Sequence, residues 1–153
     1  NNFCNLAVEA EMAIKVDADS NILSVFPIIE LHNFVFRAPQ KSLSELIANN
    51  GLNRGLVSSA KSWQEPLEFY EKKLELSLEI NGLEIDSGEL WPMEGGPTSS
   101  LHWLKNHLAD HDLKILPGNI ILGGTALGLH KVQAGDRIDV KVGGKKAVNC
   151  FIK

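Results

Sequence analysis

The sequence predicts one β-rich α+β domain in which two short helices accompany a larger number of strands. Its 153 residues suit a single domain, and its content of 44% hydrophobic and 22% charged residues is typical of an ordinary folded protein. Apolar and polar residues alternate along several segments with the period of two that half-buried strands show. Apolar residues have helical spacing near 43–49 and 98–110. We therefore expect residues 1–153 to form one domain dominated by strands.

The chain is expected to begin with a β-hairpin. Residues 6–16 alternate in the manner of a strand, and the polar run 17–21 contains the residue types of a turn. Residues 22–31 resume as a second apolar strand, which Pro27 is expected to interrupt. The two strands are predicted to pair.

A capping-box spacing marks the start of the first helix. Ser42 precedes Glu45 by three residues, so each side chain can bond the backbone N–H of the other residue. Leucine and isoleucine side chains then give residues 43–49 an apolar face. The sequence Asn49-Asn50-Gly51 ends the helix, and residues 55–59 are interpreted as another short strand.

The clearest local signal lies in the middle of the chain. Residues 74–80 alternate strictly and are followed by Asn81-Gly82, a dipeptide favoured in two-residue hairpin turns because both positions need a positive φ. Residues 83–89 are predicted to return as the partner strand.

The last third is expected to supply the second helix and further strands. Thr98 or Ser99 can cap this helix, which is predicted to end near Asp110. The remaining strands are predicted at 120–124, 137–142 and 147–152.

Charge, hydropathy and cysteine content exclude several functional classes. A net charge of −4 lacks the broad positive field that binds nucleic acid or anionic membranes. No apolar run approaches the roughly 18 to 20 residues that span a bilayer. Cys4 and Cys150 are too few for a cysteine-rich metal cluster; they could pair if the terminal strands are neighbours, but reduced thiols are the simpler interpretation. We expect a soluble, cytoplasmic chain with no nucleic-acid or membrane partner.

Two predicted strands carry carboxylates in otherwise apolar surroundings. Glu9 and Glu11 are two residues apart and so share one face of a strand, and Glu30 lies close to them if the hairpin forms. Because unpaired carboxylates repel one another and are costly to bury, such a set needs a cation, a proton or solvent. Mg²⁺ or Mn²⁺ would supply the cation, since hard ions take oxygen ligands. A solvated strand face is the alternative that spacing alone leaves open.

The histidines and a glycine-rich turn give weaker signals. His32 either lines the same site or faces solvent, and solvent is the preferred interpretation. His107 and His111 have the i, i+4 spacing of a zinc site but lack the glutamate of an HExxH motif, so we interpret them as a surface helix end. Gly123-Gly124-Thr125 could bring backbone N–H groups and a hydroxyl close to a carboxylate.

Several segments match, in order, the motifs of one known family. Residues 8–13, which contain Glu9-Ala10-Glu11, look like a Glu-x-Glu metal strand, and residues 27–31 look like the segment with a third acidic ligand. The further matching segments are 46–57, 96–104, 116–125 and 132–136. This order resembles the fumarylacetoacetate hydrolase superfamily, in particular its branch of 2-keto-4-pentenoate hydratases and 4-oxalocrotonate decarboxylases. The resemblance covers nearly the whole chain.

The resemblance implies a fold and a set of site residues. The fold would be a mixed β-sheet roll or sandwich with two short helices, and Glu9, Glu11 and Glu30 would hold a divalent ion, Mg²⁺ or Mn²⁺. A 2-oxo acid would chelate that ion, which would stabilise the enolate that develops when a proton moves or a C–C bond changes. Thr125, at the family's Gly-Ser/Thr position, would bind the substrate carboxylate, and Ser58 is a further candidate for the same pocket.

The implied function is that of a metal-dependent lyase of aromatic catabolism. It would hydrate a 2-hydroxypenta-2,4-dienoate-like acid or decarboxylate a related 2-oxo diacid. The alternatives are a non-catalytic ligand-binding or assembly subunit and a C–C bond hydrolase of acylpyruvates. Family members carry a further segment ahead of the metal strand, with a basic catalytic residue, so no catalytic residue is assigned here. We expect the chain to be the C-terminal portion of such an enzyme, or a reduced homologue, and to form homo-oligomers.

Overall fold

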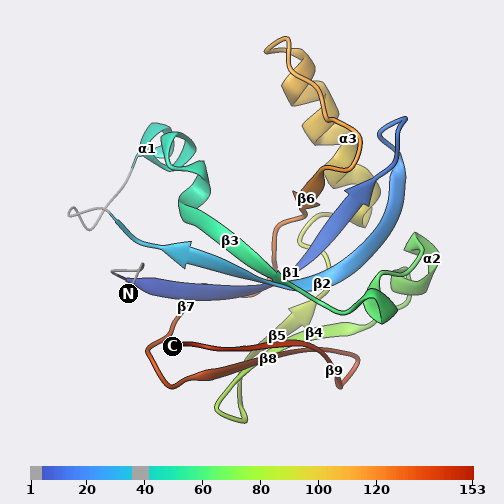
Figure 1. The fold of residues 1–153 in the computed structure, drawn as a ribbon. Helices are drawn as coiled ribbons and strands as arrows, with labels where there is room; N and C mark the ends of the chain where they lie inside the picture. Colours follow the sequence, from blue (N-terminus) through green and yellow to red (C-terminus); the bar gives the residue numbers. More distant parts are fainter. Residues whose placement is uncertain (1–4, 36–41) are drawn as a thin grey trace.

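The computed structural model describes residues 5–35 and 42–153, which form two β-sheets with a shared hydrophobic core and three short α-helices (Figure 1). The first sheet has the strand order β3-β2-β1-β6, with β7 also paired to β1, and the second has the order β5-β4-β8-β9. The strands are β1 Leu6–Val16, β2 Ile22–Asn33, β3 Asn53–Ser58, β4 Glu75–Ile80, β5 Leu83–Glu89, β6 Ile120–Leu122, β7 His130–Lys131, β8 Arg137–Val142 and β9 Lys145–Phe151. The expected β-rich α+β fold is confirmed. Every pairing among the described strands is antiparallel, however, so the sheets are not mixed.

The hairpin of β1 and β2 lies at the centre of the first sheet, as predicted. Its turn is closed by Asp17, whose carboxylate accepts the backbone N–H groups of Asp19 at 2.9 Å and Asn21 at 2.8 Å. This is the local side-chain bonding that makes aspartate common in turns. Local bonds thus close the turn that joins the two longest strands.

Strand β2 runs through Pro27, whereas the sequence predicted an interruption there. Val25 donates its N–H group to Glu65 at 3.0 Å, on the side of β2 away from β1. Because every second residue of a strand directs its N–H group to the same side, an N–H group at Pro27 would point to that side too. On that side, Pro27 falls between this bridge and the first pair with β3, which joins Ile28 to Ser58. Because no donor is needed at that point, proline fits within the strand.

The second sheet contains the predicted Asn81-Gly82 hairpin. Asn81 and Gly82 have φ values of 54° and 81°, as this type of turn requires. The side chain of Asn81 accepts the backbone N–H of Arg137 at 2.9 Å and donates to Asp136 at 2.9 Å. The β4–β5 turn is thereby tied to the beginning of β8.

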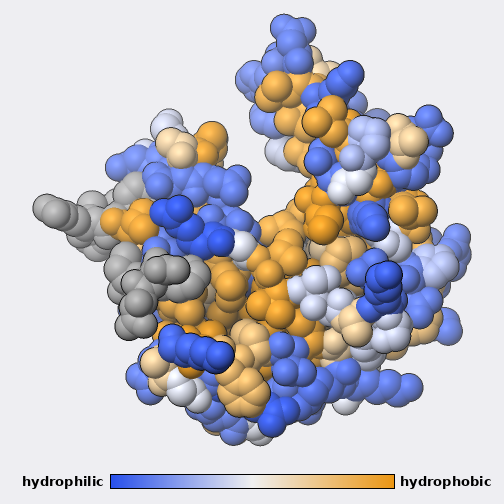
Figure 2. All heavy atoms as spheres, viewed as in Figure 1, coloured by the Kyte–Doolittle hydropathy of each residue, from blue (hydrophilic) through white to orange (hydrophobic). Residues whose placement is uncertain are grey.

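The helices within residues 5–35 and 42–153 lie outside the two sheets, and they number three rather than two. They are α1 Leu43–Ala48, α2 Leu67–Tyr70 and α3 Gly96–Ala109, with the 3₁₀ turns η1 Asn50–Leu52 and η2 Lys61–Trp63. Ser42 and Glu45 form the predicted capping box of α1. Figure 2 shows hydrophobic side chains gathered in the hollow between α1 and α3.

The start of α3 differs from the prediction. The helix begins at Gly96, so Thr98 and Ser99 lie inside its first turn rather than cap it. Pro97 fits there because proline lacks an N–H group where the helix needs none. Gly95 is the N-cap, and its φ of 79° favours glycine.

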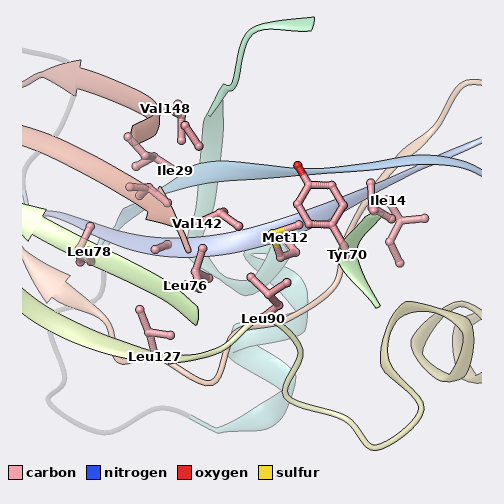
Figure 3. Packing of buried hydrophobic residues seen from close by; sticks show 14 of the residues in the cluster. Met12, Ile14, Ile29, Tyr70, Leu76, Leu78, Leu90, Leu127, Val142 and Val148 are labelled. Atoms are coloured by element: carbon pink, nitrogen blue, oxygen red, sulfur yellow. The ribbon is translucent and has the colours of Figure 1, made fainter. Parts of the chain in front are cut away.

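The main hydrophobic core lies between the two sheets (Figure 3). Alternate residues of β1 and β2 face residues of β4, β8 and β9 across it. Its completely buried members include Met12, Ile14, Ile29, Leu76, Leu78 and Ile138. Because this core uses one face of β1 and β2, the opposite face of these strands is available for other roles.

Two further features concern the helices and the cysteine thiols. Within residues 5–35 and 42–153, no helix has the length and hydrophobicity needed to cross a bilayer. Cys150 is half-buried, and burial raises the pKa of its thiol. Cys4 lies outside the described residues, so the pairing of Cys4 with Cys150 stays a prediction.

The core predicts a clear difference between two leucines of paired strands. Leu78 of β4 is completely buried, whereas Leu83 of β5 is 67% exposed. Leu78→Ala should lower the free energy of unfolding by about 2–5 kcal/mol, because it leaves a cavity. Leu83→Ala should lower it by less than about 1 kcal/mol. Urea unfolding measures both, and equal losses would contradict the assignment of the core.

Candidate metal centre

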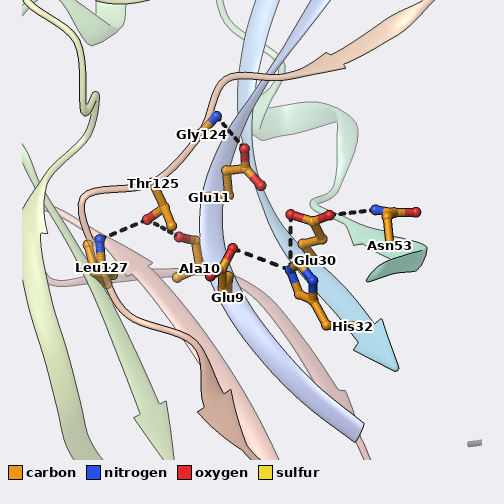
Figure 4. Close-up of polar contacts among 9 residues, drawn as sticks. All are labelled: Glu9, Ala10, Glu11, Glu30, His32, Asn53, Gly124, Thr125 and Leu127. Atoms are coloured by element: carbon orange, nitrogen blue, oxygen red, sulfur yellow. Dashed lines mark hydrogen bonds and ion pairs between the residues drawn. The ribbon is translucent and has the colours of Figure 1, made fainter. Parts of the chain in front are cut away.

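The pairing of β1 with β2 places four ionisable side chains on one face of the first sheet (Figure 4). Glu9 is paired with Glu30, and Ala7, two residues before Glu9, is paired with His32. Because side chains alternate between the two faces of a strand, these ionisable residues share their face with Glu11. The three glutamates that the sequence singled out are therefore brought together.

The same face continues into a small hydrophobic cluster. It is separate from the main core and consists of the buried Ala13, Phe26 and Ile28, with Leu56 and Leu122 packed against them. Ile28 is the strand partner of Glu11, which is only 2% exposed. The carboxylate of Glu11 is thus held between a charged region and an apolar one.

His32 lies between two of the carboxylates. Its Nε2 atom is 3.3 Å from Oε2 of Glu9 and 3.3 Å from Oε2 of Glu30. The other oxygen of Glu30 accepts a hydrogen bond from Nδ2 of Asn53 at 2.7 Å. One ligand atom from each of Glu9, Glu30 and His32 lies within 4.8 Å of the other two. Asn53 therefore orients Glu30 so that its second oxygen faces this group.

Glu11 is held by the loop that follows β6. Its Oε1 atom accepts the backbone N–H of Gly124, and Gly123 donates its own N–H to Met12 at 3.0 Å. Its Oε2 atom is buried and has no hydrogen-bond partner among the described residues. A buried carboxylate oxygen without a partner is costly, so this atom is suited to an additional ligand.

The electrostatics of the centre set the protonation states of its members. Burial raises the pKa of Glu11, and the adjacent Glu30 carboxylate raises it further. Burial also opposes ionisation of Glu30, but contact with His32 and with neighbouring groups lowers its pKa overall. For His32, burial opposes protonation, yet contact with Glu30 and Glu9 raises its pKa to about 10. At neutral pH, Glu11 holds a proton and His32 is a cation.

These residues fit a divalent metal ion. Three carboxylates offer the oxygen ligands that Mg²⁺ and Mn²⁺ take, and the unpartnered Oε2 atom of Glu11 faces the Glu30 side of the group (Figure 4). Burial without a cation forces Glu11 to keep a proton, which an ion would replace. The structure brings together Glu9, Glu11 and Glu30, the predicted ligands, and it adds His32.

The expectation that His32 faces solvent is wrong, because His32 is only 8% exposed. It lies two residues after Glu30 in the same strand, so the period of two places both side chains on one face. The spacing of two between Glu30 and His32 was therefore a signal that the sequence contained.

Asn53 was missed for a different reason: its contact with Glu30 depends on the register of β3 with β2.

The two predicted substrate-binding hydroxyls lie near the centre but have other partners. Thr125 donates its hydroxyl to the carbonyl of Ala10 at 2.7 Å and accepts the N–H of Leu127 at 3.0 Å. Ser58 lies opposite Ile28 in the sheet and donates to the carbonyl of its neighbour Ser59 at 3.2 Å. Both serve local structure here, and their contact with a substrate stays a prediction.

The histidines of α3 do not join a metal group in the described parts of the chain. His107 is exposed and stacks on the ring of Trp103 with a centroid distance of 5.0 Å, while His111 meets it edge-on at 5.1 Å. This arrangement agrees with the surface helix end that the sequence indicated.

A cavity of about 700 Å³ lies apart from the carboxylates. It is lined by residues between α2 and β4 and by the segment from β5 to the start of α3, and it includes Tyr70 and Trp91. The ring of Trp91 packs so closely on Gly123 that a Cβ atom there would lie 3.0 Å away. Trp91 therefore separates this cavity from the loop that holds Glu11, and the candidate metal ligands do not line the cavity.

Known proteins resemble this chain in sequence and in fold. No protein-family model matches the chain. Over 133 residues it is 26% identical to 2-oxo-hept-4-ene-1,7-dioate hydratase of Escherichia coli, an alignment that covers 82% of this chain and 49% of the hydratase. The chain thus spans about half the length of this curated relative.

Solved structures show the same fold. The 4-oxalocrotonate decarboxylase of Pseudomonas putida G7, complexed with magnesium and adipate, superposes with a TM-score of 0.87 at 21% identity, over 99% of this chain and 62% of the decarboxylase. A fumarylacetoacetate hydrolase family protein from Yersinia pestis CO92 superposes with a TM-score of 0.60 at 18% identity, over 100% of this chain and 76% of that protein.

The sequence similarity to the hydratase and the fold shared with these structures agree with the resemblance to the fumarylacetoacetate hydrolase superfamily. The proteins that this chain resembles include two enzymes, a hydratase and a decarboxylase, and the structure of the decarboxylase contains magnesium. A second structure of the same decarboxylase contains calcium and acetate. The matching regions correspond to part of each relative.

Glu11→Gln should stabilise the metal-free protein at pH 8. Because the raised pKa keeps Glu11 protonated in the fold while it ionises above its ordinary 4.5 in the unfolded chain, native stability falls as pH rises from 4.5 towards the raised pKa. Glutamine avoids this loss and can still accept from Gly124. We expect the free energy of unfolding to rise by about 1–3 kcal/mol. Thermal unfolding in the presence of a chelator measures this, and each kcal/mol should raise the unfolding temperature by about 2–4 °C.

The exposed Glu84 provides the control for this measurement. Glu84→Gln makes the same chemical substitution at the surface without removing a buried carboxyl group, so its unfolding temperature should match the wild type. A Glu11→Gln protein that unfolds at or below the wild-type temperature at pH 8 would contradict the assigned burial cost.

His32→Gln should destabilise the metal-free protein in a pH-dependent way. The pKa of His32 rises on folding from 6.5 to about 10, so its charge stabilises the fold fully below 6.5 and progressively less as pH rises to about 10. The difference in unfolding free energy between wild type and variant should shrink across this window, as urea unfolding at several pH values would show. His32→Asn serves as a second variant, since lost packing does not depend on pH. A constant difference from pH 6 to about 10.5 would contradict the ion pairs.

Proposed function

We propose that this chain holds a divalent metal ion and acts on small 2-oxo or 2-hydroxydienoic acids as a lyase. The observation that carries the proposal is the convergence of Glu9, Glu11 and Glu30 on one buried face, with an oxygen of Glu11 lacking a partner. Sequence similarity to a hydratase and structural similarity to a magnesium-bound decarboxylase support the same chemistry.

Glu9, Glu11 and Glu30 would hold the ion, either Mg²⁺ or Mn²⁺. When bound, such an ion supplies Lewis acidity that stabilises negative charge on a 2-oxo or enolate oxygen. Glu11 and His32 must give up their protons before they can offer lone pairs, because both are protonated at neutral pH. Ion binding should therefore release protons and strengthen as pH rises.

The surrounding residues would orient the ligands and shape the pocket. Asn53 fixes one oxygen of Glu30, and the N–H of Gly124 fixes one oxygen of Glu11, so each carboxylate keeps its other oxygen for the ion. The apolar cluster around Phe26 and Ile28 borders the same face and would exclude water from the substrate's carbon chain.

Thr125 and Ser58 are the proposed substrate-binding groups. Thr125 directly follows Gly124, so it lies beside the loop that fixes Glu11, and Ser58 lies across Ile28 from the same glutamate. The hydroxyl of Thr125 donates to the Ala10 carbonyl, so its donation to a substrate carboxylate requires the O–H group to turn about the Cβ–Oγ1 bond. These two residues would set the position of the acid group.

Hydration of a dienoic acid is the proposed reaction, and decarboxylation of a 2-oxo diacid is the related alternative. The described residues of the centre include no group that we assign as the catalytic acid or base. Because the chain spans 49% of the hydratase and 62% of the decarboxylase, turnover is proposed for an assembly that contains the remaining part of the pocket. Association of several copies is part of this proposal.

Calorimetric titration tests the metal site. Wild type should bind Mg²⁺ or Mn²⁺, and oxalate, a mimic of a 2-oxo acid, should bind more tightly once the ion is present. Titrations in two buffers with different ionisation enthalpies should show proton release. Glu11→Gln should lose most of the affinity, whereas Glu84→Gln should keep it. Failure of the wild type to bind either ion would remove the proposal.

An ultraviolet assay tests the reaction. In an assembly of this chain with the remaining part of the pocket, loss of absorbance of 2-hydroxypenta-2,4-dienoate should depend on the added ion and should be reduced by Glu11→Gln. Ion and oxalate binding without turnover would instead support a ligand-binding subunit. Cleavage of acylpyruvates without hydration, seen by product analysis, would support the C–C hydrolase.

A further inference from the structure

The candidate centre contains a nitrogen atom that a site of three carboxylates does not require. His32 Nε2 lies 3.3 Å from Oε2 of Glu9 and 3.3 Å from Oε2 of Glu30, and the side chain is only 10% exposed. These contacts are ion pairs, and among the described residues none of them has hydrogen-bond geometry. A ring nitrogen that faces two carboxylates pairs with them as a cation when protonated and offers them a shared lone pair for an ion when neutral.

The ligand atoms of Glu9, Glu30 and His32 are grouped closely enough for a single ion. One atom from each residue lies within 4.8 Å of the other two. Asn53 holds the remaining oxygen of Glu30 at 2.7 Å, which leaves Oε2 on the side of the histidine. Figure 4 shows the imidazole ring and the carboxylates of Glu9 and Glu30 directed to one region, with the Glu11 carboxylate next to it.

We infer that His32 is a fourth ligand, through Nε2, and that it makes the centre favour ions such as Mn²⁺ over Mg²⁺. The inference rests on the proposed function, because it assumes that the three glutamates hold an ion. His32 is then the residue that selects the metal, whereas the carboxylates bind divalent cations in general.

Ligand chemistry gives the direction of the preference. Mg²⁺ is small, keeps several waters and is bound mainly through oxygen, so a fixed imidazole nitrogen adds little to its affinity. Affinity for sites with nitrogen ligands rises along the first-row series that begins at Mn²⁺, and imidazole is a common ligand of its later members, so a ring nitrogen shifts the preference of the centre away from Mg²⁺ and towards this series. The strand geometry fixes the nitrogen, since β2 carries both Glu30 and His32 on one face. The nitrogen therefore contributes more to Mn²⁺ than to Mg²⁺.

Pulsed electron paramagnetic resonance of the Mn²⁺-loaded chain tests the ligand directly. Wild type should show modulation from a directly bound ¹⁴N nucleus, and protein grown with ¹⁵N-histidine should show the ¹⁵N pattern in its place. This comparison needs no substitution, so it does not depend on whether a variant folds. His32→Gln should lose the modulation.

His130→Gln is the matched control, because His130 is also partly buried and contacts a carboxylate, with Nε2 at 2.9 Å from Oδ2 of Asp86. It lies on β7 opposite Val8, whose side chain is on the other face of β1 from Glu9, and it does not belong to the group of potential ligands, so the variant should keep the nitrogen signal. Loss of the signal in His130→Gln but not in His32→Gln would overturn the inference.

Calorimetric affinities for Mg²⁺ and Mn²⁺ give a second readout. His32→Gln should weaken Mn²⁺ binding by at least about tenfold and weaken Mg²⁺ binding less, so that the preference for manganese falls. Equal weakening of both ions would overturn the selecting role of His32.

The outcomes separate this inference from the proposed function. Mn²⁺ that binds tightly without a directly bound nitrogen would leave the metal-dependent lyase standing and remove His32 as a ligand. A wild-type chain that binds neither Mn²⁺ nor Mg²⁺ would remove both proposals.

Discussion

The antiparallel register of β1 with β2 is the constraint on which the centre depends. It places Glu9 directly opposite Glu30 and brings Glu11 onto the same face, so like charges meet where water is largely excluded. The repulsion is offset by the proton on Glu11 and by the positive charge of His32. A change of register by one residue would turn this whole set of side chains to the other face of the sheet.

The two faces of the first sheet divide stability from chemistry. One face joins the second sheet in the main core, where residues such as Met12 and Ile14 are completely buried. The other face carries the carboxylates and a much smaller apolar cluster. Burial of Glu11 weakens the metal-free fold, and the main core supplies the stability that tolerates it. The strand pair can serve both purposes because its side chains alternate.

Local periodicity predicted much of the fold, because hairpins depend on neighbouring residues. The Asn81-Gly82 turn and the Glu9-x-Glu11 strand could be recognised in this way. Features set by distant contacts could not: α2 and β7 are too short to show a period, and the hydrogen bond from Gly124 to Glu11 joins residues 113 positions apart. The burial of His32 could not be predicted either, because the sequence does not show that this face of β2 is covered.

The Asp17 turn has a consequence for engineering the chain. It closes the hairpin at the end away from the carboxylates, about 17 Å along β1 from Glu11 at the usual rise per strand residue. The irregularity at the Lys15–Val16 step lies between this tip and the regular pairs around the glutamates. An affinity tag or a fluorescent label inserted at residues 18–19 would lengthen the loop while the pairing of Glu9 with Glu30 is conserved.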